Sequence, residues 1–210
     1  SLTHIGRSGK MLFMRLFIAV LVLIFTFQTP SQADDIRDFQ IEGMSVGDSL
    51  LDHFSEEEIK KNESSAFIWK TKFLINSFTY KSQFETYDRV QVAYKKNDKK
   101  YIIYGLDGVI FHKNNIEECY SKKDEIVEEL SKIYANAAKK HAVTKKHELD
   151  HSGKSKSTVV EFWFNTGDLS RVICTDWSED FEKNKNYWDD LAVILNLKEY
   201  SDFLMHEANY

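Results

Sequence analysis

Residues 87–111 read YDRVQVAYKKNDKKYIIYGLDGVIF, and this stretch decides the fold class. Val90 and Val92 alternate with polar or small neighbours, which is the period-two pattern of a half-buried strand. A polar turn at Asn97 separates this strand from a second apolar run at 101–104. The two runs therefore predict a β-hairpin.

The same signals recur along the chain. Gly105 to Gly108 either turns the chain again or forms a bulge before a further apolar run. Turns, and not helical crossovers, join the apolar runs, so neighbouring strands should pair antiparallel. We predict an α+β fold with an antiparallel sheet of about six or seven strands in hairpins or a meander. The further strands are expected at 67–78, 158–164, 171–177 and 191–195.

Helices are expected to cover this sheet. Segments 45–48 and 55–58 each begin with serine and end with an acid, a capping pattern that predicts an N-terminal helix pair. Residues 116–137 place apolar side chains three and four positions apart, as in a central amphipathic helix that packs on a sheet. Residues 198–208 predict a C-terminal helix.

The first 33 residues differ in composition from the rest. Residues 1–10 precede the first methionine and are interpreted as upstream sequence or an expression remnant. Residues 11–33 have a basic start, an apolar run and a small-x-small end, which is the pattern of a cleaved secretory signal peptide. No glycine- or proline-rich linker divides the remainder. We therefore predict a single α+β domain at 34–210 in a periplasmic or secreted protein.

The predicted mature chain is acidic. The sequence has 28 Lys and Arg against 33 Asp and Glu, a net charge of −5, and residues 1–33 hold three basic residues and no acid. Residues 34–210 thus have a net charge of −8. Nucleic-acid and anionic-membrane binding depend on clustered basic residues, whereas these lysines are scattered among acids. We expect no nucleic-acid partner, and no membrane contact after signal cleavage.

Cys119 and Cys174 are the two cysteines of the chain. In an exported protein an even cysteine count favours a disulfide bond. Cys174 shares a strand face with Val172, from which it could meet Cys119 on the covering helix. The alternative is two buried free thiols. We predict the Cys119–Cys174 bond.

Two serine-hydrolase motifs overlap near the start of the mature chain. Residues 47–50 read GDSL, in which Ser49 would be the nucleophile, and residues 43–47 match G-x-S-x-G around Ser45. The sequence lacks the G-x-N-D and D-x-x-H blocks of GDSL hydrolases, and Ser45 is not preceded by an apolar strand. A small GDSL-type serine esterase using Ser49 is kept as the alternative function.

Residues 147–151, HELDH, match the H-E-x-x-H zinc motif. Two histidines bind the metal when they lie one turn apart on a helix with a buried face. Here the flanks are polar, and a third ligand would have to come from Glu161 or Glu179. We interpret 145–157 as a solvated hairpin loop and keep zinc binding through His147 and His151 as a further alternative. No resident metal or other cofactor is predicted.

Five strings resemble a set of small exported proteins of Pelagibacter-type marine bacteria. This resemblance covers most of the mature chain and implies export but no particular activity. The opening is also similar to BamE/SmpA-type envelope domains, in which a glycine-led capped helix pair precedes a three-strand meander. The chain departs from that pattern by lacking a lipobox cysteine and by its greater length. The five strings are ADDIRDFQIEGMSVGDSLLDHFSEEEI (33–59), KKYIIYGLDGVIFHKNNIEECY (99–120), SGKSKS (152–157), ICTDWSE (173–179) and KEYSDFLMHEA (198–208).

The leading hypothesis for function is an exported, non-catalytic binding or envelope-associated module. It rests on the absence of a complete catalytic set from the sequence. The partner would be a protein or small molecule of the cell envelope. No catalytic, cofactor-binding or metal-binding residue is assigned.

Overall fold

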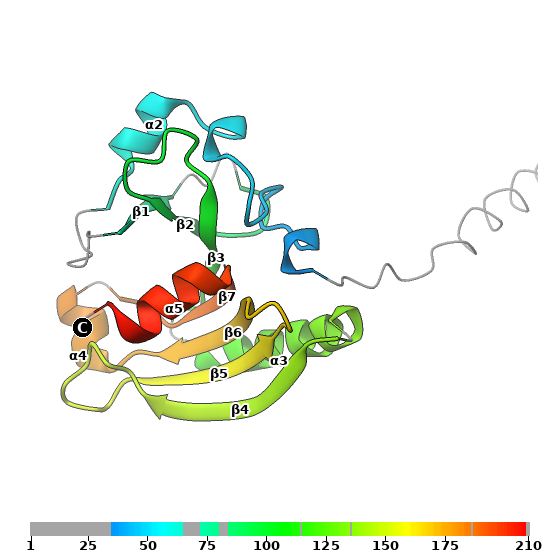
Figure 1. Cartoon of the computed structure of the whole chain (residues 1–210). Helices are drawn as coiled ribbons and strands as arrows, with labels where there is room; N and C mark the ends of the chain where they lie inside the picture. The colour runs from blue at the N-terminus through cyan, green and yellow to red at the C-terminus, as the bar shows by residue number, and fades with distance from the viewer. Residues whose placement is uncertain are drawn as a thin grey trace, which may run out of the picture. The chain divides into compact units, whose positions relative to one another are not determined.

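Seven strands form one antiparallel sheet in the order β1-β2-β3-β7-β6-β5-β4 (Figure 1). In this computed structural model the described residues are 35–64, 72–79, 84–113, 115–134, 136–185 and 187–208. The predicted α+β class and antiparallel sheet are confirmed. In chain order the strands are β1 (Phe73–Phe78), β2 (Arg89–Lys95), β3 (Ile103–Phe111), β4 (Ala138–Lys146), β5 (Lys156–Trp163), β6 (Leu169–Asp176) and β7 (Asp190–Asn196).

The pairing of β3 with β7 joins two meanders, β1-β2-β3 and β4-β5-β6-β7, into this sheet. It runs from Gly105 opposite Asn196 to Phe111 opposite Asp190. The extra residue of a bulge, Tyr104, enters β3 because Tyr94 pairs with Ile103 while Ala93 pairs with Gly105. Gly105 to Gly108 themselves continue β3 and pair regularly with Ala93 to Val90, so the turn is wrong and the bulge lies one residue before the segment in which it was expected.

Four α-helices and two 3₁₀ turns lie in the described residues. Ser55 starts α2 with a full capping box to Glu58, as predicted. Asn115 caps α3 by accepting a hydrogen bond from the Glu118 N–H. The elements are η1 (Ile36–Asp38), η2 (Leu50–Asp52), α2 (Glu56–Lys61), α3 (Ile116–Ile133), α4 (Glu179–Lys185) and α5 (Lys198–His206).

The helix predicted to begin at Ser45 is wrong. The Gly47 N–H donates to the Ile103 carbonyl at 2.8 Å, and the Leu50 N–H donates to the Tyr101 carbonyl at 3.0 Å. These bonds tie the segment to the start of β3 and use backbone groups that a helix would need. Helical winding is limited here to η2, which spans three residues.

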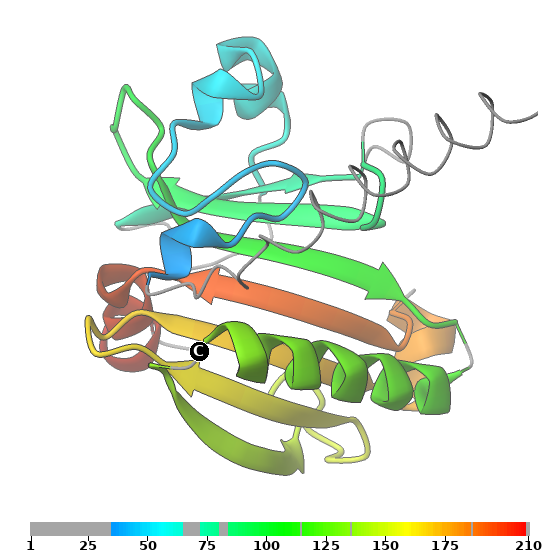
Figure 2. The same ribbon diagram turned by 90° about the vertical axis from the view of Figure 1, so that its right-hand side faces the viewer.

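The face of the sheet that α3 covers, here called the proximal face, holds the main core. α3 packs on β6 and β7 and runs along them in Figure 2. Apolar residues of the N-terminal segment join the same core. Its fully buried members include Ile36, Ile41, Leu50, Val90, Val92, Leu106, Val172, Leu191 and Leu195.

The opposite face, here called the distal face, has a smaller core under α5. Tyr200 and Phe203 of α5 pack on Phe73 of β1, with ring centroids 5.0 and 5.1 Å from that of Phe73. A Cβ atom at Gly105 would lie 2.5 Å from the Tyr200 ring. Glycine at this position therefore allows α5 to approach β3 closely.

β4 is a strand that the sequence does not predict, and Lys145 and Lys146, which are expected in the loop 145–157, belong to it. All nine residues of β4 are exposed, so no apolar alternation marks the strand. It forms through backbone pairing with β5, from Ala138 opposite Trp163 to Lys146 opposite Lys156.

Residues 1–33, where the signal peptide is predicted, lie outside the described residues. The described residues belong to one compact unit, residues 33–210. Within the described part of the chain, no helix combines the length and the apolar character needed to cross a membrane.

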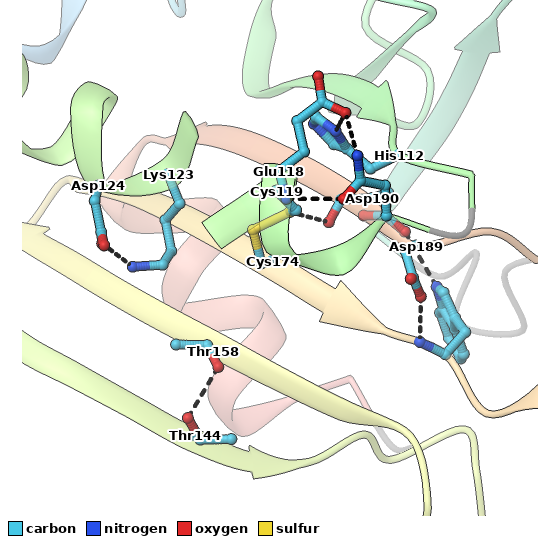
Figure 3. Close-up of a disulfide and its surroundings, with 12 residues drawn as sticks. His112, Glu118, Cys119, Lys123, Asp124, Thr144, Thr158, Cys174, Asp189 and Asp190 are labelled. Carbon is cyan, nitrogen blue, oxygen red and sulfur yellow. Dashed lines mark hydrogen bonds and ion pairs between the residues drawn. A yellow bond between two sulfur atoms is a disulfide. The ribbon is translucent and has the colours of Figure 1, made fainter. Parts of the chain in front are cut away.

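Cys119 of α3 and Cys174 of β6 form a disulfide bond, as predicted, with an S–S distance of 1.99 Å (Figure 3). Both cysteines are fully buried. The bond adds a covalent link to the contact by which α3 covers the sheet. It joins residues with a sequence separation of 55.

Replacing both Cys119 and Cys174 by serine should lower the free energy of unfolding by about 4 kcal/mol, because a bridge closing a loop of this length restricts the unfolded chain. Urea unfolding of the variant and of the wild type measures the difference. Wild-type protein in reducing agent is the matched control and should resemble the variant. Two free thiols in the unreduced, denatured wild type would contradict the bond.

Candidate functional site

Ser49 is placed as a structural residue. Its hydroxyl donates to the Lys100 carbonyl at 2.6 Å and accepts from the Leu51 N–H at 3.2 Å. The first bond holds the N-terminal segment to the turn before β3, and the second caps η2. A serine nucleophile needs a base within hydrogen-bond reach. The contacts made by Ser49 serve the backbone instead.

Ser45, the other candidate nucleophile, is buried in a turn. Its hydroxyl donates to the Phe39 carbonyl at 3.3 Å, and its N–H donates to the Asp48 carboxylate at 2.8 Å. A nucleophile elbow instead presents the serine between a strand and a helix. The strand-to-helix context that the G-x-S-x-G motif needs is not formed around Ser45.

The HELDH segment forms no helix and lies in the loop between β4 and β5. The His147 ring packs on Trp177 with centroids 4.3 Å apart, and its Nδ1 accepts from the Leu149 N–H at 3.2 Å. Burial lowers the pKa of His147. His151 is exposed. The two imidazoles are therefore not arranged as a pair of ligands on one helical face.

The residues considered as third zinc ligands are also engaged elsewhere. Glu161 pairs with Arg171 at 3.0 Å, and Glu179 pairs with Lys183 at 2.8 Å. Within the described ranges, no three His, Cys, Asp or Glu side chains are grouped so that they could hold a metal ion.

Asp150 organises the loop that was expected to be merely solvated. Its carboxylate accepts from the Ser155 N–H at 2.9 Å, the Ser155 hydroxyl at 2.7 Å and the Ser178 hydroxyl at 3.1 Å. Hydrogen bonds from Ser152 and Ser155 hold the pKa of Asp150 well below its usual value. The loop is thus tied to the end of β6, and its acid has a structural role.

A second acidic group lies beside the disulfide (Figure 3). Asp189 accepts from the Trp177 N–H at 2.8 Å, and Asp190 accepts from the Trp177 indole at 3.1 Å. Burial raises the pKa of both carboxyl groups, that of Asp190 to about 6. These two acids hold Trp177 in place, and we therefore assign them a structural role.

The distal face presents a row of side chains that crosses all seven strands. Strand register places these residues opposite one another, one from each strand. All are polar except Ile194, and all are partly or fully exposed. This polar row reads, from β1 to β4, Ser77, Gln91, Asp107, Ile194, Arg171, Glu161 and Lys140.

One end of the polar row is internally paired. Glu161 contacts Arg171 at 3.0 Å and Lys140 at 3.4 Å. It also accepts a hydrogen bond from the Trp163 indole at 2.9 Å. Burial acts to raise the pKa of Glu161, but the hydrogen bonds and positive charges of these neighbours act to lower it more strongly. The pKa of Glu161 therefore lies below its usual value.

Asp107, the β3 member of the row, lies outside this paired group. Asp107 forms no hydrogen bond or ion pair with any residue that the structure describes. Arg89, in the adjacent row, is turned over the Phe111 ring with its guanidinium carbon 5.2 Å from the centroid. Its Nε is buried and has no partner among the described residues. Two opposite charges on neighbouring strands thus stay separate.

Burial raises the pKa of Asp107 to about 7, although Arg89 and Arg171 act to lower it. A carboxyl group that is desolvated without a hydrogen-bond donor lowers the stability of the folded state when it ionises. Such groups are concentrated at functional sites. Asp107 and Arg89 are therefore the candidate site residues, and their position suits the binding of a charged group.

Sequence reasoning missed this site because its members come from different strands. One signal in the sequence could have indicated it: Asp107 is an acidic residue inside the largely apolar segment from Ile102 to Ile110.

No protein-family model, curated protein or solved structure matches the chain.

Replacing Ser49 by alanine should lower the free energy of unfolding by about 1 kcal/mol, because η2 loses its cap. We expect a fluorophosphonate probe to label neither the wild type nor this variant. Ser121→Ala, on the exposed side of α3, is the control and should not destabilise the protein. Labelling of the wild type that disappears in Ser49→Ala would instead support the esterase hypothesis.

Replacing Asp107 by asparagine should raise the free energy of unfolding at pH 8 by about 1–3 kcal/mol. The folded-state pKa of about 7 lies above the ordinary value, so wild-type stability falls as pH rises from about 4 to about 7. The variant lacks this loss. Each unit by which the folded-state pKa is raised corresponds to about 1.4 kcal/mol in the free energy of unfolding, and partial solvent access reduces this effect.

Urea unfolding at pH 5 and pH 8 measures this effect. Glu129→Gln, which removes an exposed carboxylate from α3, is the matched control and should change neither value. If Asp107→Asn were no more stable than the wild type at pH 8, the carboxylate would have a stabilising partner and would not be a free site.

Proposed function

We propose that this chain is an exported, non-catalytic binding protein whose ligand site is the centre of the distal face, around Asp107 and Arg89. The observation that carries the proposal is that Asp107, partly exposed on the distal face, has no hydrogen bond or ion pair with any residue that the structure describes. A desolvated carboxyl without a donor disfavours folding, and a bound cationic group would reverse that penalty. The geometry thus favours a ligand that brings a positive charge to Asp107.

The surroundings add two requirements for the ligand. The guanidinium of Arg89, a partly exposed side chain that lies over the Phe111 ring, offers a second contact point, for an anionic group of the ligand. Between Arg89 and the edge of the sheet, the row next to the polar row is apolar. The ligand is therefore an amphipathic group with both charges, presented by a small molecule or by a partner's surface. The members of the apolar row are Val109, Ala192, Ile173, Val159 and Val143.

Export is part of the proposal. A buried disulfide is typical of proteins that fold in oxidising compartments. The basic and apolar start of residues 11–33 supports cleavage of a signal peptide. We further propose that the N-terminal segment and α3 cover the proximal face while α5 covers part of the distal face, so that the site lies on the remaining distal surface.

A thermal-shift experiment tests the binding proposal. Purified protein at pH 7.5 is mixed with the dialysable and the retained fractions of a native cell-envelope extract. A ligand of the folded state raises Tm by mass action, so one fraction should raise Tm of the wild type by several degrees. The active fraction tells a small molecule from a macromolecular partner.

Two variants test whether the rise in Tm comes from binding at Asp107 and Arg89. The shift should be lost in Asp107→Asn combined with Arg89→Gln, and kept in Glu129→Gln. Each variant is compared with its own Tm without extract, because the site substitutions alter the baseline. An equal shift in the site variant, or no shift in either fraction, would contradict a ligand site at Asp107.

A further inference from the structure

The two edges of the sheet differ in how far the protein's own backbone covers them. At β1, the Ser64 N–H donates to the Ile75 carbonyl at 2.8 Å, and the Ser77 N–H donates to the Asn62 carbonyl at 3.1 Å. An isolated bridge joins Glu63 to Asn76 between them. The outer side of β1 is therefore covered by the protein's own backbone.

β4, at the other edge, pairs with β5 alone in the part of the chain that the structure describes. All nine of its residues are exposed, and Val143 is 60% exposed. The outer N–H and C=O groups of an edge strand are a template for a further strand. The sheet is thus extendable at β4.

This edge is also basic, although the whole chain has a net charge of −5. Of the acids nearby, Asp150 is engaged in its own hydrogen bonds and Glu161 faces Lys140 at 3.4 Å. Asp180 pairs with Lys154 at 3.5 Å, and Asp176 lies opposite Lys156 on the inner side of β5. The lysines of β4 and of the neighbouring part of β5 therefore dominate the local field. These are Lys139, Lys140, Lys145 and Lys146 of β4 and Lys156 of β5.

Lysines and a bulge also protect edge strands from aggregation, and β4 has an irregularity between Lys140 and Val143. Protection does not account for Lys146 directly opposite Lys156, since like charges on paired positions destabilise a sheet. Asp176, opposite Lys156 on β6, offsets one of these two charges and leaves the other. An acidic chain placed alongside would neutralise the remaining charge. Residues 143–146 after the irregularity pair regularly with β5 and provide the straight segment that such a chain needs.

We infer that β4 is a docking edge for an extended acidic segment of a partner protein, which adds an eighth strand to the sheet. Backbone hydrogen bonds along β4 give the affinity, and lysines on both faces of the strand select acidic side chains. Val143 favours an apolar residue near the middle of the segment. This surface shares Val143 with the apolar row but includes neither Asp107 nor Arg89, and it does not depend on the proposed ligand there.

The test uses a fluorescent peptide, Ac-EEVTVTVEE-NH₂, and anisotropy with the full-length protein at low salt. The wild type should bind it, and Lys145→Glu combined with Lys146→Glu should weaken binding at least tenfold. Lys99→Glu combined with Lys100→Glu reverses the same charge in an exposed turn and should leave binding within about twofold. Unchanged Tm values show that both variants fold.

Two further measurements separate strand addition from simple charge attraction. The peptide Ac-EEVPVPVEE-NH₂ has the same charge but cannot donate at its prolines, and it should bind at least tenfold more weakly. Amide exchange of residues 143–146 should slow when the first peptide binds. Equal binding of the proline peptide, no binding of the first peptide, or dimerisation of the protein through β4 would overturn the proposal.

Discussion

The register between β3 and β7 is the constraint on which the rest of the structure depends. It joins the two meanders and sets Asp107 opposite Ile194, which in turn lies opposite Arg171. A slip of one residue would turn the side chains of one meander to the other face. The proximal core and the polar row are therefore specified together, because alternate residues of the same strands build both.

Much of the fold could be predicted from local patterns. Strands with one buried face, such as β2 and β6, show apolar alternation, and α3 shows helical spacing with a clear cap at Asn115. The disulfide bond could be predicted from the even number of cysteines and from the strand face on which one of them lies. β4 could not be predicted, because a strand exposed along its whole length has no apolar pattern and depends on pairing with β5. The turn before η2 was missed because Gly47 bonds to a distant residue, Ile103.

The candidate site was not predicted, for a related reason. Catalytic motifs are short strings, and short strings such as those around Ser49 and His147 also serve as caps and turns. Ser49 bonds to a carbonyl 51 residues away, and His147 packs on Trp177. A site assembled from one residue per strand leaves no string to find. Asp107 becomes conspicuous only in the folded structure, where no donor among the described residues reaches it.

The disulfide also shapes the order in which the sheet can close. About 80 residues separate the end of β3 from the start of β7, and the closure entropy of such a loop grows with its length. The bridge has a sequence separation of 55 and lies wholly inside this loop. Once it forms, the path between the two strands shortens to about 25 residues, which lowers the entropic cost of pairing by about 1 kcal/mol. Oxidation before the central pairing would thus act as a kinetic aid to assembly of the two meanders.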